Sequence, residues 1–252
     1  MLLRVLGCSG AEFPGHNPSA FLLDDSLLLD AGTVGAVLAE EEQWRIRDIL
    51  VSHPHLDHIR GIPLLADNII VKGLANRVNV VSTGEIIAPI RTHLLNGVIW
   101  PDFTRIPSAA APVLSCREIV PEKEFIIGDF RVSAFCVNHT VPAVGFRITK
   151  GATTLVYTGD TGPTDRIWEM AGDISALLVE VSFPNDMEET ALLTQHLTPI
   201  LLERELAKLG KLPPRILVTH LKPQYYDRIK AELGLLQIPD IEVLHDGDVY
   251  EL

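Results

Sequence analysis

The chain has 252 residues, of which 47% are hydrophobic and 21% are charged, so it can bury a sizeable core and has the composition of an ordinary soluble globular protein. Its formal net charge of −12 gives no excess of positive charge to attract a polyanion, which disfavours extended nucleic-acid binding. We find no stretch long enough to span a membrane and no signal-peptide pattern in the first residues. The three cysteines lack CxxC spacing, which is typical of buried thiols in a reducing compartment (Cys8, Cys116 and Cys136). We therefore expect a cytoplasmic enzyme.

Apolar runs bounded by turn residues predict short strands in the first half of the chain. We expect a strand at residues 2–8, a hairpin of residues 19–23 and 27–30, and a helix from about Val34 to Glu42. A strand then enters a histidine-rich stretch, which a helix of roughly Asp57 to Asp67 follows. After a strand at residues 78–81, Ser82-Thr83-Gly84-Glu85 is a capping-box sequence that predicts a helix to about Asn96. The proline-bearing stretch 100–112 is expected to be a structured surface loop.

The second half alternates strands with helices. Strands are expected at 113–119, at 125–138 with a turn at Gly128-Asp129, at 144–148 paired with 153–157, and at 176–180. Thr198-Pro199 predicts an N-cap and a first-turn proline for a helix that stops at Gly210. A strand at 215–219, a helix at 223–233 closed by Gly234, and strands at 241–244 and 249–252 complete the order. We predict one α/β domain over residues 1–252, with two mixed β-sheets packed face to face and helices outside.

Three imidazoles and a carboxylate fall within six positions, in the stretch His53-Pro54-His55-Leu56-Asp57-His58. A hydrophobic core does not need four such residues at one strand end, whereas zinc, manganese and iron favour these nitrogen and oxygen ligands. His53 and His55 can turn to one side as the strand ends, and Asp57 and His58 can face another from the first helical turn. The stretch can therefore begin two metal sites; the alternative is a solvated histidine-rich loop.

Further candidate ligands directly follow apolar strand runs: His139 after residues 130–138, Asp160 after Tyr157-Thr158-Gly159, and His220 after residues 216–219. Each of them alone could be a hydrogen-bonded residue at a strand end. Together with the histidine-rich stretch, they indicate that polar residues gather along one edge of the predicted sandwich.

This pattern resembles the metal motif of the metallo-β-lactamase superfamily, whose fold is an αββα sandwich. The resemblance covers nearly the whole chain. Within the superfamily, several segments resemble the class II 3′,5′-cyclic-nucleotide phosphodiesterases, namely residues 53–65 (HPHLDHIRGIPLL), 99–108 (IWPDFTRIPS), 157–163 (YTGDTGP), 180–185 (EVSFPN), 196–199 (HLTP) and 219–223 (THLKP).

The resemblance implies two divalent metal ions, with zinc favoured and manganese or iron open. One ion would be bound by His53, His55 and His139, the second by Asp57, His58 and His220, and Asp160 would bridge them. In this scheme a hydroxide shared by the two ions, which Asp57 could orient, opens cyclic AMP or cyclic GMP to the 5′-monophosphate. Asp30 would hold His53 or the strand ends from outside the ligand shell; bonding within its own turn is the alternative.

His196 is the most informative residue that is not a ligand, because it precedes the predicted helix cap beside the expected metal edge. The related transfer-RNA 3′-processing endonucleases have a histidine at a comparable point. By this analogy His196 contacts the phosphate or protonates the leaving oxygen, and the alternative is a helix-start histidine bonded to backbone. No such context surrounds His16, His93 or His245.

The leading hypothesis is a metal-dependent phosphodiesterase for a small cyclic nucleotide, with neither extended nucleic acid nor a membrane as partner and with a homodimer left open. One rival is another hydrolase on this fold, such as an RNA 3′-processing endonuclease or a thioester or lactone hydrolase. A second rival is a metal-binding regulatory or redox protein. The acidic charge argues against structured RNA, residues 100–108 favour the cyclic-nucleotide branch, and His196 beside a full ligand set favours chemistry over binding alone.

Overall fold

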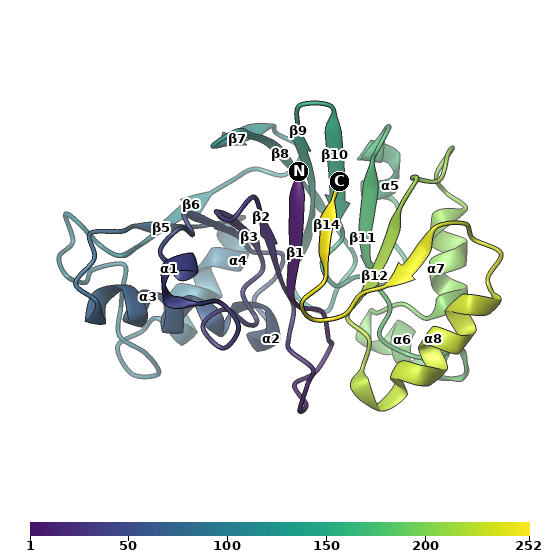
Figure 1. The fold of residues 1–252 in the computed structure, drawn as a ribbon, viewed down its shortest axis with the longest axis horizontal. Helices are drawn as coiled ribbons and strands as arrows, with labels where there is room; N and C mark the ends of the chain where they lie inside the picture. Colours follow the sequence, from purple (N-terminus) through teal and green to yellow (C-terminus); the bar gives the residue numbers. More distant parts are fainter.

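The computed structural model describes residues 1–252 as two seven-stranded β-sheets with helices on their outer faces (Figure 1), which confirms the predicted αββα sandwich. The first sheet has the order β14 (Val249–Glu251), β1 (Leu2–Gly7), β2 (Ala20–Leu23), β3 (Leu27–Leu29), β4 (Asp48–Leu50), β5 (Val78–Ser82) and β6 (Leu114–Glu118). The second has the order β13 (Ile241–Val243), β12 (Ile216–Thr219), β11 (Ala176–Glu180), β10 (Thr153–Tyr157), β9 (Val144–Lys150), β8 (Phe130–Cys136) and β7 (Phe125–Ile127).

Each sheet is parallel over four neighbouring strands, β3 to β6 in the first and β10 to β13 in the second. The register pairs Leu28 with Ile49 in one sheet and Val156 with Leu177 in the other. Strands of parallel sheets that are covered on both faces are apolar throughout, and β3, β11 and β12 are buried at every position. Because parallel strands end at a common edge, residues that follow them gather there.

Helices of the two chain halves cover opposite sides of the sandwich (Figure 1). The first half contributes α1 (Glu40–Gln43), α2 (Leu56–Ile59), α3 (Gly61–Val71), α4 (Gly84–Pro89) and the π-helix η1 (Ile90–Leu94). The second half contributes α5 (Arg166–Ala171), the 3₁₀ turn η2 (Asn185–Met187), α6 (Glu188–Thr194), α7 (Pro199–Leu206), the 3₁₀ turn η3 (Pro223–Tyr225) and α8 (Tyr226–Leu235).

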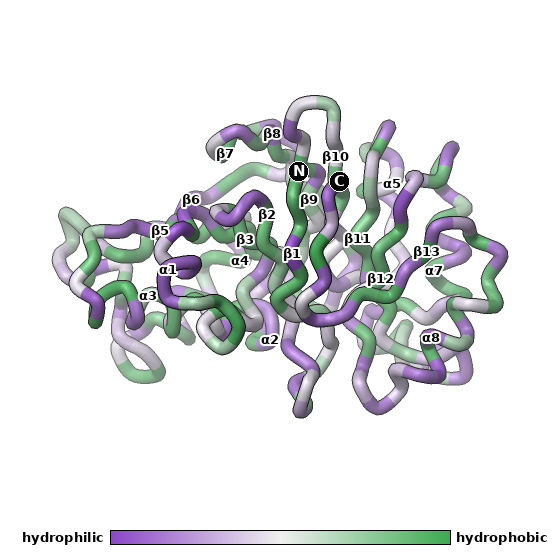
Figure 2. Tube along the Cα trace, in the orientation of Figure 1, coloured by the Kyte–Doolittle hydropathy of each residue, from purple (hydrophilic) through white to green (hydrophobic).

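The apolar interior has two parts. The larger lies between the sheets and under α3, and the smaller lies between the second sheet and the helices α5, α7 and α8. Figure 2 shows the central strands as largely hydrophobic and much of α8 as hydrophilic. None of the helices is long and apolar enough to cross a membrane.

Four helix predictions need correction. The helix expected from Val34 to Glu42 is only the short α1, and residues 34–38 form turns and bends. Gly32, two residues before this segment, lies against distant chain, since a Cβ there would be 1.9 Å from the carbonyl oxygen of Asp57. The helix expected from Asp57 to Asp67 is divided at Arg60, since the Gly61 amide donates to Ala31 O at 2.7 Å and not to its own helix.

The predicted capping box at residues 82–85 is also wrong. The Ser82 hydroxyl donates to Val51 O at 2.6 Å, and Thr83 is the N-cap residue of α4 without a side-chain cap bond. The helix then changes to the π-helix η1 after Pro89, which lacks the amide hydrogen that a regular turn requires. At Thr198 the predicted cap is confirmed, since its hydroxyl accepts from the Leu201 amide at 3.3 Å, but the helix ends at Leu206 and not at Gly210. Two short helices, α5 and α6, were not expected, and α8 continues one residue past Gly234.

Candidate metal centre

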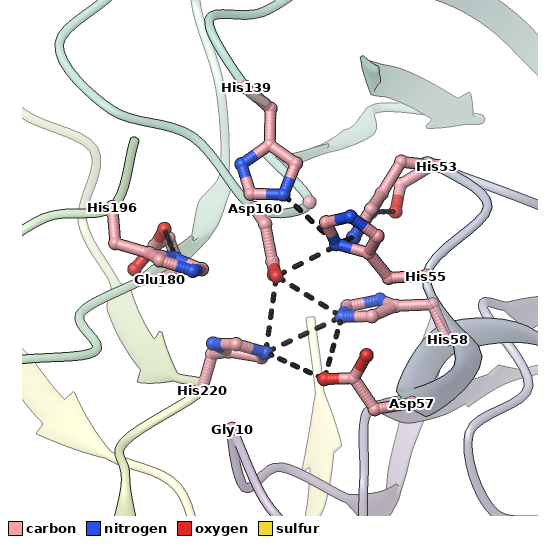
Figure 3. Close-up of polar contacts among 12 residues, drawn as sticks. Gly10, His53, His55, Asp57, His58, His139, Asp160, Glu180, His196 and His220 are labelled. Carbon is pink, nitrogen blue, oxygen red and sulfur yellow. Dashed lines mark hydrogen bonds and ion pairs between the residues drawn. The ribbon is translucent and has the colours of Figure 1, made fainter. Parts of the chain in front are cut away.

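The carboxyl ends of strands from both sheets bring five imidazoles and two carboxylates together, and these are the seven residues that the sequence singled out. Figure 3 shows their side chains pointing at a common region. The first sheet supplies the segment after β4, and the second sheet supplies residues just after β8, β10 and β12. The donors fall into two groups with one carboxylate between them.

The first group consists of His53, His55 and His139. The Nδ1 atom of His55 lies 3.1 Å from Nε2 of His53 and 3.2 Å from Nε2 of His139. His53 is fully buried, whereas the other two side chains are partly exposed. Three nitrogens thus face one point that remains open toward solvent on one side.

The second group consists of Asp57, His58 and His220. The Nε2 atoms of the two histidines are 3.4 Å apart, and Oδ2 of Asp57 lies 3.5 Å from Nε2 of His220 and 3.8 Å from Nε2 of His58. Both imidazoles are buried, and 35% of the Asp57 side chain is exposed. The carboxylate therefore closes the group on its solvent side.

Asp160 lies between the two groups. One oxygen, Oδ2, is 3.6 Å from Nε2 of His53, 3.3 Å from Nε2 of His58 and 3.2 Å from Nε2 of His220. Its side chain is 4% exposed. A single carboxylate oxygen therefore faces donors of both groups, as a bridging ligand must.

These residues fit a pair of divalent cations. Ligands about 2.1 Å from a tetrahedral ion lie about 3.4 Å from one another, and the separations within each group are close to that value. Imidazole and carboxylate donors suit zinc, manganese and iron. Although burial alone would raise the pKa of Asp160, the imidazoles of His220 and His58 hold that pKa well below its ordinary value, so the carboxylate is charged. Burial lowers the pKa of His53 well below its ordinary value, which favours the neutral form that binds metals.

Hydrogen bonds on the far nitrogens orient four of the five histidines. The Nδ1 atoms of His58, His139 and His220 donate to Asp30 Oδ2 at 2.8 Å, to the Gln195 carbonyl at 3.1 Å and to Ser182 Oγ at 2.8 Å. In His53, Nδ1 lies 3.0 Å from Ser52 Oγ. Such partners fix the tautomer and the ring orientation of a metal-binding histidine, so that Nε2 faces the ion.

Asp30 is the centre of this outer network. Its buried carboxylate accepts from the amide and the hydroxyl of Ser52, at 2.7 and 2.6 Å, from His58 Nδ1, and from the Tyr157 hydroxyl at 2.6 Å. All of these partners lie more than twenty residues away in the sequence, so bonding within its own turn is excluded. Asp30 holds His58 directly and His53 through Ser52.

His196 lies against the same centre, with one ring nitrogen within 4.8 Å of donor atoms of His139 and Asp160. Its Nδ1 donates to Oε1 of the fully buried Glu180 at 2.7 Å, which leaves Nε2 available to the site. Burial alone would lower the pKa of His196, but the charge and hydrogen bond of Glu180 raise it above its ordinary value. His196 is thus oriented by a carboxylate and not by backbone at the helix start.

Of the orienting residues, the sequence pointed to Asp30 but assigned no role to Ser52, Glu180, Ser182 or Gln195. Ser52 and the Gln195 carbonyl gave no signal, because their roles depend on partners far away in the sequence. Ser182 lies within the segment 180–185, which resembles the phosphodiesterases, but nothing in that segment indicated its bond to His220. Glu180 did give a signal, since it directly follows the apolar run of β11 in the same way that His220 follows β12. Of the histidines without context, His16 lies near Ser9 at 3.3 Å, His245 bonds with Tyr226 at 2.7 Å, and His93 is exposed on η1.

The chain belongs to the β-lactamase superfamily. The family model described as the beta-lactamase superfamily domain matches residues 27–221. Among curated relatives, a probable 3′,5′-cyclic-nucleotide phosphodiesterase of Yersinia pestis is 26% identical, over 88% of this chain and 78% of that protein. The probable metallo-hydrolase YhfI of Bacillus subtilis is 26% identical over the full length of both chains.

Two solved structures extend this similarity to the fold. Unliganded yeast PDE1 superimposes with a TM-score of 0.82 at 19% identity over 98% of each chain. The short form of human tRNase Z superimposes with a TM-score of 0.75 at 18% identity, over 100% of this chain and 99% of that one. The fold and the donor set therefore define a metallo-hydrolase of this superfamily, one that resembles cyclic-nucleotide phosphodiesterases and also has tRNase Z among its structural neighbours.

Proposed function

We propose that this protein is a dinuclear metal-dependent phosphodiesterase that hydrolyses 3′,5′-cyclic nucleotides to 5′-monophosphates, with zinc as the favoured ion. The observation that carries the proposal is the position of Asp160 Oδ2 between two groups of three donors, with a carboxylate-held histidine beside them. The choice of substrate is supported by the names of two relatives, the probable 3′,5′-cyclic-nucleotide phosphodiesterase of Yersinia pestis and the 3′,5′-cyclic-nucleotide phosphodiesterase 1 of Saccharomyces cerevisiae.

Bound at this centre, a pair of cations would lower the pKa of water toward about 7 and offset the negative charge that gathers on the phosphoryl oxygens. The ligands would set the direction from which the phosphodiester is approached, and Asp160 would keep the two groups at a fixed separation. Asp57 uses Oδ2 toward His220 and His58, which leaves Oδ1 to orient the attacking water.

His196 would supply the proton for the leaving 3′ oxygen. An alkoxide is a poor leaving group, and a positioned acid typically accelerates such a step by about 10²–10⁴-fold. Because Nδ1 donates to Glu180, the proton transferred is the one on Nε2. Glu180 would stabilise the protonated ring before the transfer and keep its orientation afterwards.

A panel assay tests the substrate. We expect protein loaded with zinc or manganese to hydrolyse cyclic AMP or cyclic GMP and bis(p-nitrophenyl) phosphate, and to leave precursor tRNA and a thioester intact. Elemental analysis of protein purified without chelator should give two ions per chain. Cleavage of precursor tRNA or of the thioester without turnover of either cyclic nucleotide would overturn the proposal. A constant single equivalent of metal after added zinc or manganese would overturn its dinuclear form.

A further inference from the structure

Beside the metal centre lies a cavity of about 830 Å³, a volume typical of small-ligand sites. Its walls come from the ends of β5 and β6 and from the connection between β8 and β9. That connection carries His139, which is the only member of the seven-residue donor set in the wall. The cavity therefore adjoins the His53, His55 and His139 side of the centre, and a substrate held at the metals would extend into it.

The chemistry of the wall determines which part of a substrate the cavity can take. Apart from His139, its only ionisable side chains are those of Glu85 and Cys136, and it contains no lysine or arginine. A phosphate would be repelled by Glu85, so an uncharged group must occupy the space. Much of the wall is apolar, including Ile119, Val120 and Val141, which suits a flat ring better than a sugar.

Besides the exposed Thr140, the wall offers two polar side chains for recognition at the start of α4. Thr83 is 8% exposed and does not use its hydroxyl to cap α4, so this hydroxyl is free to bond a ligand. Glu85 is exposed at the first turn of α4. A carboxylate only accepts hydrogen bonds. It therefore matches a ring edge with adjacent donors, as guanine has in N1–H and N2–H₂. Adenine places an acceptor, N1, beside its N6 donors.

We propose that this cavity binds the base of the nucleotide and that Glu85 makes guanine the preferred base. The proposal rests on the function proposed above and adds the recognition site and its preference. The metals would hold the phosphate, and the cavity would hold the base at the end of the substrate away from them.

Contrary to the expectation that the cysteines are buried, Cys136 is exposed in the cavity wall, and it provides a test that does not depend on catalysis. In a Cys116→Ser background, which removes the other accessible thiol, the rate of Cys136 alkylation by N-ethylmaleimide is measured by mass spectrometry on metal-loaded protein. We expect saturating 5′-GMP to slow the reaction about tenfold and 5′-AMP to require higher concentrations. Ribose 5-phosphate, which lacks a base, should not protect. Equal protection by ribose 5-phosphate, or none by either nucleotide, would overturn the base site.

Two variants test the assignment kinetically. Val120→Trp should raise KM for cyclic GMP about tenfold, and by at least fivefold more than for bis(p-nitrophenyl) phosphate, because losing contacts to one base weakens binding by about that much. The matched control is Val71→Trp, at an exposed position remote from the cavity, which should leave both values unchanged. Equal changes in KM for both substrates would contradict the site.

Glu85→Gln exchanges an acceptor-only group for one that also donates, the pattern that glutamine uses with adenine. The ratio of kcat/KM for cyclic GMP to that for cyclic AMP should fall about tenfold. An unchanged ratio would remove Glu85 from recognition. If neither cyclic nucleotide is hydrolysed by the unaltered protein, the proposed function fails. The alkylation experiment then still decides whether the cavity binds a base.

Discussion

At the scale of single residues, Asp160 is the carboxylate that connects the two groups, because one of its oxygens faces imidazoles of each group. Asp160→Asn keeps the shape of the side chain and removes its charge. We expect the variant to hold fewer than two ions per chain. We also expect cyclic-nucleotide hydrolysis to fall by more than about 100-fold. Removing a residue that only hydrogen-bonds a metal ligand typically reduces activity by about 10–100-fold, and Asp160 would itself be a ligand.

Elemental analysis and turnover at saturating metal measure both effects, and circular dichroism verifies the fold. The control is Asp165→Asn, whose side chain is 78% exposed and pairs with Lys208 away from the centre. Near-normal turnover by Asp160→Asn would show that this residue is not the bridge.

His196 can be tested through the leaving group. If its Nε2 protonates the 3′ oxygen, His196→Ala should reduce kcat for cyclic AMP by about 10²–10⁴-fold. The loss should be much smaller with bis(p-nitrophenyl) phosphate, since p-nitrophenolate leaves without a proton. Metal content should stay the same, and His93→Ala, at an exposed histidine, serves as control. Equal losses on both substrates would assign His196 to phosphate binding or site geometry.

At the scale of elements, the loop after β1 supports the end of β12. The Gly10 amide donates to Leu221 O at 3.0 Å, and a Cβ on Gly10 would lie 2.4 Å from the His220 carbonyl and 2.8 Å from its Nδ1. His220 itself has a φ of 65°, a conformation that non-glycine residues adopt only when their surroundings impose it. This close approach (Figure 3) requires a glycine at position 10.

Gly10→Ala should therefore displace His220 and weaken binding at the second group of donors. We expect the two ions per chain to fall to one in a titration with zinc, with little loss at the first group. Gly234→Ala is the matched control, since nothing lies within 4 Å of an added Cβ there. Full occupancy of both sites by Gly10→Ala would contradict the role of this contact.

The helices and strands also show which parts of the fold can be predicted from sequence patterns. Strands were predicted well because apolar runs such as residues 176–180 have one stable environment, the interior of a sheet. The helix expected from Val34 begins only at Glu40, and the packing of Gly32 against Asp57 just before that segment is a contact that no local pattern reveals. For the same reason the seven donors could be predicted from strand ends, whereas the partners of His139 and His220 could not.

At the scale of the whole molecule, the metal centre connects the two sheets. The first group takes His53 and His55 from the segment after β4 and His139 from the second sheet, and the second group takes Asp57 and His58 from one side and His220 from the other. Each ion would thus cross-link both halves of the sandwich. Ions that bind the folded chain and not the unfolded one stabilise it by mass action.

Removing the ions should therefore lower the thermal stability of the whole fold. At a thousandfold excess of metal over Kd, one site contributes about 4 kcal/mol, which corresponds to roughly 8–16 °C in Tm for a domain of this size. We expect a chelator to lower Tm by at least that amount and added zinc to restore it. The control is His220→Ala, which removes a ligand from one site only and should show a smaller shift on chelation. If the chelator removes the metal and Tm stays unchanged, the stability of the sandwich does not depend on the metal centre.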